Sequence, residues 1–342
     1  MITSDQLHQK LKHVTVAGST CSYTEEYCDK IAPIVNEINR LKEETNTVIL
    51  AHSYVNPEIV YGVADYTGDS YQLSRNALES GADNILFVAV KFMAETAKIL
   101  NPEKNVYVPA ALNGCSLADS ITGADVRKLK EDNPDYTFVC YINTTADVKA
   151  QCDVCVTSGN VYNIIESLPT DKIYFVPDKL MGLNIIDEMT RRGVEKDIKL
   201  WDGVCYVHEE YDPDMIDYIR GEFDGVKVLA HPECSPGVLN HSDFVGSTAQ
   251  LLKFMETSDA EAFLMLTECG LSARLQVEMP EKNFVGSCSV CKYMKANTLE
   301  NILECLKNPK PQNEIHLTKE DVQGSRRCID AMFHYAEKTT SK

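Results

Sequence analysis

The chain has 342 residues, 44% hydrophobic and 25% charged, which is typical of a globular protein with a sizeable buried core. Acidic residues outnumber basic residues by 51 to 33, and the formal charge of -18 argues against nucleic acid or an anionic membrane as a partner. The 13 cysteines are too many for chance packing alone, yet the chain is far longer than the small secreted domains that disulfides hold together. No signal peptide and no run of ~18 apolar residues is present, so a reducing, cytoplasmic location is expected.

In chain order, amphipathic helices are expected first, and three similar segments follow. Each segment opens on an apolar run of strand length that ends in polar residues, and the three recur about every 90 residues. The runs are TVILAHSYVNPEIV, TFVCYINTTADVKA and VKVLAHPECSPGVL. Their strand-end residues are His52, Tyr141 and His231.

Each opening run is followed by three further elements in the same order. A segment with an aspartate and a hydroxyl residue comes first (ADYTGDS, DVCVTSGN, SDFVGST), then a second strand (NILFVAV, KIYFVPD, AFLMLTE), then a short strand that leads to a cysteine. The hydroxyl residues are Ser70, Ser158 and Thr248, and the cysteines are Cys115, Cys205 and Cys291.

Strands that alternate with helices over so long a repeat predict an α/β fold of three similar three-layer α/β/α domains with parallel sheets. The domains are expected at 34–130, 131–221 and 222–310, with helices in 1–33 and 311–342 packed on them. Ligands of open α/β sheets bind beyond the carboxyl ends of the strands. Three units around a pseudo-threefold axis would therefore direct the three cysteines and the three hydroxyls into one central cavity.

Three thiolates in equivalent positions suit an iron–sulfur cluster or a zinc ion, and three ligands leave one position open for a substrate. The simpler alternative is that each is a small buried hydrophobic residue. Cys152 and Cys155 form a Cys-x-x-Cys pair without equivalents in the other units and are interpreted as structural. Cys288 and Cys291 form a second pair, in which a disulfide would remove a ligand and make the site redox-sensitive. The remaining cysteines are expected to pack in the core: Cys21, Cys28, Cys140, Cys234, Cys269, Cys305 and Cys328.

The motifs AHSYVNPEI, ADYTGDS, FMAETAKILNPEK, GCSLAD, TSGN, WDGVCYVHE, AHPEC and VCKYMK resemble those of the quinolinate synthase (quinolinate synthetase A) family across nearly the whole chain. The resemblance implies three α/β/α domains around a pseudo-threefold axis and a [4Fe–4S] cluster on Cys115, Cys205 and Cys291. It implies condensation of iminoaspartate with dihydroxyacetone phosphate to quinolinate, phosphate and water in NAD biosynthesis. It also implies an enzyme that supplies iminoaspartate, because that substrate is unstable.

The resemblance also implies substrate contacts, which the family motifs place on polar residues of the repeats. A plain helix N-cap is the alternative role for each of the three hydroxyls. The implied contacts are His52, Ser70, Tyr141, Asn143, Ser158, His231, Glu233 and Thr248.

Three residues are expected to handle protons. Glu233 is the preferred general base, provided that burial raises its pKa toward neutrality. Tyr54 is an acid–base or gating candidate, and His208 could contact phosphate or protonate a leaving group; ordinary hydrogen-bonded wall residues are the alternative for both.

Further residues are expected to be peripheral or distinctive. Glu95 and Lys98 are expected to form a solvated ion pair or to shape the site. The peripheral set comprises Thr267, Glu268, Met294 and Lys295, and the departures from the family pattern are Ser53, where tyrosine is expected, and Lys292, where proline is frequent.

Two other functions stay open from the sequence. A hydro-lyase could use the same open iron on a simpler hydroxy acid, without a triose phosphate. A non-enzymatic zinc protein or iron–sulfur sensor would need a closed fourth ligand or a nucleic-acid surface, and the charge of -18 opposes the latter.

Overall fold

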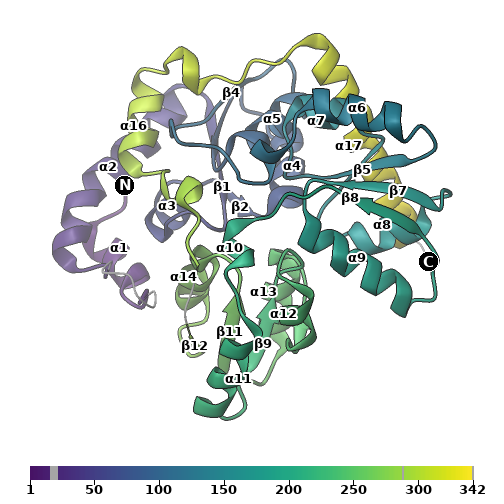
Figure 1. Cartoon of the computed structure of the whole chain (residues 1–342). Coiled ribbons are helices and arrows are strands. Elements are labelled where there is room, and N and C mark those ends of the chain that lie inside the picture. The colour runs from purple at the N-terminus through teal and green to yellow at the C-terminus, as the bar shows by residue number, and fades with distance from the viewer. Residues whose placement is uncertain (16–21, 287–288, 341–342) are drawn as a thin grey trace.

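The structure is a computed structural model that describes residues 1–15, 22–286 and 289–340. Within these ranges the strands form three separate four-stranded sheets, one after another along the chain (Figure 1). The strands are β1 Thr47–His52, β2 Tyr66–Gly68, β3 Asn84–Val88, β4 Asn105–Tyr107, β5 Thr137–Tyr141, β6 Val154–Val156, β7 Lys172–Val176, β8 Asp197–Leu200, β9 Lys227–Ala230, β10 Phe244–Val245, β11 Ala262–Leu266 and β12 Asn283–Val285.

All three sheets have the same topology. Their strand orders are β2-β1-β3-β4, β6-β5-β7-β8 and β10-β9-β11-β12, and every pairing is parallel. The strand that opens each unit thus lies second in its sheet, with its carboxyl end beside that of the next strand. Parallel strands need covering on both faces, and the central strands are accordingly almost wholly buried. The predicted α/β class with three parallel sheets is confirmed.

Helices connect the strands in the same order in each unit. The first unit has α3 Pro57–Gly62, α4 Ser70–Glu79, α5 Lys91–Leu100, η1 Ala118–Ser120 and α6 Gly123–Asp132. The second has α7 Ala146–Gln151, α8 Val161–Ser167, α9 Lys179–Arg191, α10 Tyr206–Glu209 and α11 Pro213–Glu222. The third has α12 Pro236–Asn240, α13 Thr248–Thr257, α14 Cys269–Glu278, α15 Lys292–Lys295 and α16 Leu299–Lys307. The predicted domain boundaries stay predictions; the first two fall in the last turns of α6 and α11.

Three more long helices lie outside the sheets' own connections. Helices α1 Ser4–Leu11 and α2 Glu25–Glu44 pack together, and α2 also packs on α16. After η2 Pro311–Asn313, helix α17 Lys319–Thr340 returns to the second unit, where it lies along α7 and against β6 (Figure 1). None of the helices in the described part of the chain is both long enough and apolar enough to span a membrane.

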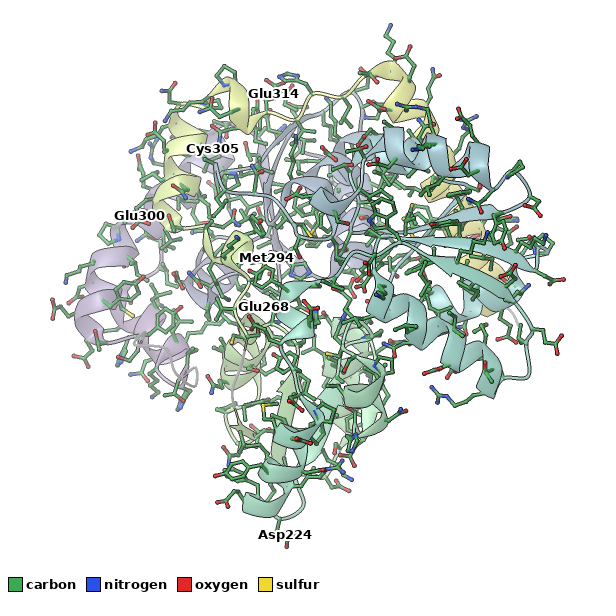
Figure 2. All side chains as sticks on the ribbon, in the orientation of Figure 1. Asp224, Glu268, Met294, Glu300, Cys305 and Glu314 are labelled. Carbon is green, nitrogen blue, oxygen red and sulfur yellow. The ribbon has the colours of Figure 1, made fainter. Side chains whose placement is uncertain are left out.

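Side chains extend from all three units, both outward and toward their junction (Figure 2). Glu268 and Met294 lie toward the middle of the molecule, whereas Asp224 lies at its outer edge (Figure 2). One face of the third sheet shares a continuous core with the first sheet, which contains both Phe87 and Phe263, whereas Val228 and Leu264 of the third sheet belong to a smaller separate core. The second sheet has a core of its own, built around Phe138 and Phe175 and closed by α17.

Most cysteines outside the repeat positions are buried core residues, as predicted. This holds for Cys28, Cys140, Cys152, Cys155, Cys234, Cys305 and Cys328. Cys269 is also buried, but it differs from the prediction because its sulfur takes part in a disulfide bond. Cys291 has a free thiol. Cys21 and Cys288, and with Cys288 the predicted redox pair, lie outside the described residues.

The start of α14 packs on the chain after β1 so closely that only glycine fits there. A Cβ atom on Gly270 would lie 2.3 Å from the carbonyl oxygen of Tyr54. We predict that Gly270→Ala lowers the free energy of unfolding by ~1–3 kcal/mol, because backbone must move to make room. Urea unfolding measures the change. Gly221→Ala is the matched control, since no atom lies within 4 Å of its added Cβ; equal losses in both variants would contradict the prediction.

Candidate active site

One pocket lies where the carboxyl ends of the three sheets meet. Its lining comes from the loops after β1, β5 and β9, the starts of α4 and α13, and the segments that carry the three repeat cysteines. Every site residue expected from the sequence lines this pocket: His52, Tyr54, Ser70, Cys115, Tyr141, Asn143, Ser158, Cys205, His208, His231, Glu233, Thr248 and Cys291. The structure thus brings together residues spread over more than half of the chain.

The three cysteines have equivalent local surroundings. Cys205 and Cys291 are the residues before α10 and α15, and Cys115 precedes the turn that leads into η1. Backbone amides of the following turn hydrogen-bond to each sulfur: those of Leu117 and Ala118, of His208, and of Tyr293 and Met294.

Burial nevertheless disfavours the thiolate form of all three. It raises the pKa of Cys115 to about 12 and also raises the pKa of Cys205 and Cys291. A cationic metal centre would reverse this, since a coordinating thiol gives up its proton to the metal. Three half-buried thiols with amide donors at one pocket therefore fit a metal cluster with three cysteine ligands.

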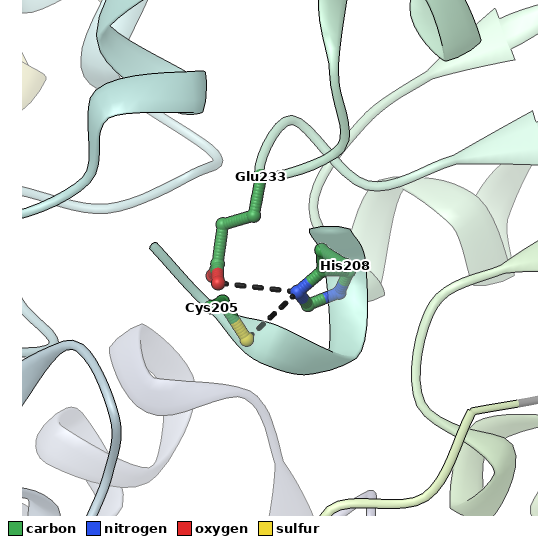
Figure 3. A group of neighbouring side chains, drawn as sticks. All are labelled: Cys205, His208 and Glu233. Atoms are coloured by element: carbon green, nitrogen blue, oxygen red, sulfur yellow. Dashed lines mark hydrogen bonds and ion pairs between the residues drawn. The ribbon is translucent and has the colours of Figure 1, made fainter. Parts of the chain in front are cut away.

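His208 stands at the centre of a buried group with Cys205 and Glu233 (Figure 3). Its Nδ1 lies 3.2 Å from the Sγ of Cys205 and 3.2 Å from Oε2 of Glu233. Tyr141 donates its hydroxyl hydrogen to Oε1 of Glu233 at 2.7 Å. Oε1 also lies 3.5 Å from Nδ2 of Asn143. The five residues come from α10 and its N-cap, from the end of β5 and the loop after it, and from the loop after β9, so this group joins the second unit to the third.

The electrostatic state of Glu233 differs from the expectation. Burial by itself raises the pKa of this carboxyl, but the nearby His208 and His231 and the Tyr141 hydroxyl outweigh burial and lower the pKa overall. Glu233 was expected to act as a general base only if burial raised its pKa toward neutrality, and this condition is not met. A carboxylate that stays ionised serves better to orient and stabilise His208 than to take up a proton alone.

A chain of hydroxyls connects Tyr54 to His208. The Tyr54 hydroxyl lies 3.0 Å from Oγ1 of Thr248 and 2.8 Å from Oγ1 of Thr267. Thr267 in turn lies 3.0 Å from Nε2 of His208. With a proton on Nδ1 of His208, Tyr54 donates to Thr267 and Thr267 donates to Nε2 of His208, while Nδ1 lies beside Oε2 of Glu233 without a hydrogen bond to it. Burial raises the pKa of Tyr54, so its phenol is protonated at rest.

His52 and His231 face the pocket as neutral rings. Burial lowers the pKa of each to about 3, and for His231 the opposing effect of Glu233 does not offset this. A neutral imidazole has one donor and one acceptor nitrogen, so each ring can donate one hydrogen bond to a carboxylate. The rings are held in place by packing, His52 against Tyr54 and His231 against His208.

The three repeat hydroxyls lie at helix starts without serving as caps. Ser70 and Thr248 are the first residues of α4 and α13, whose N-caps are Asp69 and Ser247. Ser158 precedes α8, whose N-cap position belongs to Asn160. The alternative N-cap role is therefore wrong for all three. All three line the pocket near the positive ends of helices, where a ligand can reach their hydroxyls, although that of Thr248 also contacts the Tyr54 hydroxyl.

Comparisons with known proteins agree with this geometry. The family model for the Quinolinate synthetase A protein matches residues 36–334. The chain belongs to the quinolinate synthetase A family. It is therefore an enzyme related to proteins named quinolinate synthase.

Three relatives show how far the similarity extends. The quinolinate synthase of Sinorhizobium fredii is 42% identical over 302 residues, covering 88% of this chain and 80% of the relative. That of Aquifex aeolicus is 42% identical over 312 residues, covering 89% of this chain and 95% of the relative. That of Prosthecochloris aestuarii is 44% identical over 292 residues, covering 83% and 89%.

Among solved structures, the E-1-hydroxy-2-methyl-but-2-enyl-4-diphosphate reductase from Plasmodium falciparum aligns with a TM-score of 0.30 and 11% identity. The alignment covers 81% of this chain and 94% of the reductase. A likeness this low has no bearing on fold or activity.

Two residues that the sequence placed at the periphery of this quinolinate synthetase A chain hold the site together. Glu268, 1% exposed, accepts a hydrogen bond from the amide of Cys291 at 3.1 Å and one from Gly270 at 2.6 Å. Lys295 forms an ion pair with Glu268 at 3.2 Å and donates to the carbonyl oxygen of Tyr54 at 2.6 Å. This pair links a cysteine of the pocket to the backbone of Tyr54. The sequence contained one signal for a role of Glu268 in the site. The apolar strand before Thr267 and Glu268 places both residues at a strand end of the third repeat.

Glu95 and Lys98 do not form the expected ion pair. Glu95 is buried and accepts a hydrogen bond from the amide of Ala146 at 2.8 Å, which fixes the start of α7. Lys98 instead donates to the carbonyl oxygens of Pro102 and Lys104. Helical spacing alone could not show that Glu95 faces another unit.

The two departures from the family pattern are not among the described residues that line the pocket. Ser53 is fully buried and accepts a hydrogen bond from Arg274 at 2.8 Å, so a charged residue of α14 stands behind His52. Lys292 is exposed, and its ammonium group lies over the rings of Tyr206 and Tyr293. Neither residue displaces a cysteine of the pocket.

We predict that Thr267→Val lowers the kcat of quinolinate formation by ~10²-fold or more, since it interrupts the hydroxyl chain without a large change in volume. Thr267→Ser retains the hydroxyl and most of the activity. Thr257→Val, which alters a threonine at the exposed end of α13, leaves kcat unchanged. Steady-state kinetics measures all three variants, and equal activity of the valine and serine variants at position 267 would contradict a role for the hydroxyl.

We predict that Lys295→Met lowers the free energy of unfolding by ~1–3 kcal/mol, because it leaves the buried Glu268 carboxylate without its cation. Lys253→Met is the matched control, since that lysine is exposed and pairs with Glu256 within the same helix. Urea unfolding of both variants provides the comparison. A loss at Lys295 no larger than that at Lys253 would show that the buried pair contributes nothing to stability.

Proposed function

We propose that the chain condenses iminoaspartate with dihydroxyacetone phosphate to give quinolinate, phosphate and two molecules of water. In this proposal Cys115, Cys205 and Cys291 hold a [4Fe–4S] cluster, and the product enters NAD biosynthesis. The observation that carries it is the meeting of three half-buried, equivalent cysteines with ten polar residues in one pocket. Family membership and relatives named quinolinate synthase support the choice of reaction.

Substrate carboxylates would be bound by neutral donors, because arginine is absent from the pocket lining. Ser70, Ser158 and Thr248 come from three different units and lie at helix starts, where amide groups favour anions. His52 and His231 supply imidazole donors, and Tyr141 and Asn143 lie beside Glu233. Donors that surround the pocket on three sides suit a compact dicarboxylate and the dicarboxylate product.

Proton transfer would run through Tyr54. Its phenol faces the pocket and is connected through Thr267 to His208, which Glu233 orients. A proton that Tyr54 gives to a departing hydroxyl, or takes from carbon, is returned or passed on along this chain. In this proposal Glu233 acts as the partner of His208 rather than as the general base.

The cluster, when bound, would supply an iron with an open position that polarises a substrate hydroxyl or carboxylate as a Lewis acid. The chain's own contribution is to hold three thiols in a dry pocket and to donate backbone amides to their sulfurs. Hydrogen bonds from amides stabilise cluster sulfurs and tune their potential.

Two further parts of the proposal concern the setting of the reaction. Iminoaspartate hydrolyses in water, so an enzyme that oxidises aspartate must supply it nearby. A cytoplasmic, reducing compartment suits the ten described free thiols, which would oxidise elsewhere.

We predict that protein purified without oxygen is brown and contains about four irons per chain, and that it forms quinolinate only when both substrates are present. Cys115→Ser, Cys205→Ser and Cys291→Ser each lose the iron and the activity, because three ligands are needed to retain the cluster. Cys28→Ser, at a buried cysteine of α2, keeps both. Iron analysis and quinolinate assays with and without dihydroxyacetone phosphate make the measurement.

Two outcomes would overturn the proposal. Colourless protein without iron would exclude the cluster. Turnover of a hydroxy acid together with no requirement for dihydroxyacetone phosphate would favour a hydro-lyase instead.

A further inference from the structure

Three side chains of metal-ligating type lie around one point in the wall of the pocket. They are Cys205, His208 and Glu233, whose ligating atoms all lie within 4.8 Å of one another. Figure 3 shows that the side chains of Cys205 and Glu233 both approach the same ring nitrogen of His208. The proposed iron–sulfur cluster uses only Cys205, so it does not account for the group as a whole.

The separations of these atoms match those around a zinc ion. In a tetrahedral site with a Zn–S bond of ~2.3 Å and Zn–N and Zn–O bonds of ~2.0–2.1 Å, sulfur and nitrogen stand ~3.5 Å apart, and nitrogen and oxygen stand ~3.3 Å apart. Nδ1 of His208 lies 3.2 Å from Sγ of Cys205 and 3.2 Å from Oε2 of Glu233. Three protein ligands leave a fourth position, which water or a small anion in the pocket can fill.

One carboxylate oxygen of Glu233 is available to an ion at this point. Glu233 is 3% exposed, and its Oε2 is buried without a hydrogen-bond donor among the described residues. Buried polar atoms normally have a partner. A metal ion next to Nδ1 of His208 would supply the missing partner of Oε2, whereas Oε1 already accepts a hydrogen bond from Tyr141.

The groups behind the ligands are those that a metal site needs. Nε2 of His208 lies 3.0 Å from Oγ1 of Thr267, so the ring can donate there while Nδ1 binds a metal. Tyr141 donates to the oxygen of Glu233 that faces away from His208, at 2.7 Å. Histidine and carboxylate ligands of metals are typically oriented by such outer hydrogen bonds.

Charge also favours a divalent cation here. One thiolate, one carboxylate and one neutral imidazole balance the charge of Zn²⁺, so the loaded site has no net charge in its buried setting. The simpler alternative is that Nδ1 of His208 donates to Cys205 and that Glu233 contributes only its charge. That arrangement leaves Oε2 of Glu233 without a donor, whereas a metal ion satisfies all three atoms at once.

We propose that the chain without its iron–sulfur cluster binds one zinc ion through Cys205, His208 and Glu233. The Cys205 thiol gives up its proton to solvent as the metal binds. Ligands of nitrogen, oxygen and sulfur bind zinc more tightly than Fe²⁺, so zinc competes with iron for this chain.

Zinc and the proposed cluster exclude each other because both need Cys205. This exclusion rests on the proposed function, whereas the zinc site does not. Zinc also requires the ring proton of His208 on Nε2, and Thr267 can donate to Nε2 only in the other tautomer. The zinc-loaded chain is therefore an inactive form, from which the metal must leave before a cluster is inserted.

We predict that the full-length chain, freed of iron by a chelator without oxygen, takes up one Zn²⁺ per chain. His208→Ala and Glu233→Gln each weaken zinc binding by ~10²-fold or more, since loss of a ligand costs more than loss of an outer hydrogen bond. Cys115→Ser and Cys291→Ser are the matched controls, because they remove thiols of the same pocket that are not zinc ligands. Both bind zinc as tightly as the wild type, and competition with a chromophoric chelator measures all affinities.

Cobalt supplies a second measurement that does not depend on the variants folding. Co²⁺ added to the iron-free wild-type chain should give the visible bands of a tetrahedral site and the charge-transfer band of a thiolate ligand, and added zinc should remove both. The zinc site is overturned if the iron-free wild type retains neither metal. It is also overturned if Glu233→Gln binds zinc as tightly as the wild type, or if Cys291→Ser weakens binding as much as His208→Ala does.

Iron analysis distinguishes failure of the zinc site from failure of the proposed cluster. His208→Ala purified without oxygen keeps its iron, which shows that this variant folds, and it binds zinc weakly once the iron is removed. Cys291→Ser shows the reverse, with no iron and full zinc binding, and Cys205→Ser loses both metals. Wild-type protein that binds zinc but never contains iron would overturn the cluster and leave the zinc site in place.

Discussion

A buried carboxylate at the junction of three sheets is the constraint on which this site depends. Glu233 is 3% exposed, and an ionised group there costs several kcal/mol unless its neighbours satisfy it. The neighbours are His208 at 3.2 Å, Tyr141 at 2.7 Å and His231 at 3.6 Å. Because these groups come from two units, they surround the carboxylate only when the units are packed together; Oε1 then accepts a hydrogen bond, whereas Oε2 has only the ion-pair contact with His208. Assembly of the fold and assembly of the site are therefore one event.

The three units share a scaffold but differ in chemistry at equivalent positions. In each unit, the third strand along the chain is followed by a helix, which is α5, α9 or α14. The residue compared here is the N-cap of that helix. It is Val90 in the first unit, Asp178 in the second and Glu268 in the third. Val90 lines the pocket, Asp178 caps α9, and Glu268 holds both Cys291 and Lys295. The repeated backbone thus places these three residues at the same edge of their sheets. The chemical nature of each side chain then determines its role there.

Much of the candidate site was predictable because it depends on strand ends. The carboxyl ends of parallel strands share an edge of their sheet, so polar residues after apolar runs had to lie together within each unit. Because three cysteines occupy equivalent positions in the three repeats, a single pocket shared by all three units was the simplest prediction. The repeat could not show the partners that the residues find across units. Thr267 meets Tyr54 and His208, and Glu95 meets the amide of Ala146, through contacts between segments far apart in the sequence.

The amino-acid sequence by itself determined the α/β class, the threefold repetition, and the set of cysteines and polar residues that face the pocket. These depend on local apolar patterns and on spacing, which a sequence states directly. Only the tertiary structure decided which residues cap the helices, that the pKa of Glu233 is lowered, and that Glu268 pairs with Lys295 beside Cys291. Each of these depends on burial and on neighbours supplied by other segments. Such neighbours are set by packing in space, and no local pattern specifies them.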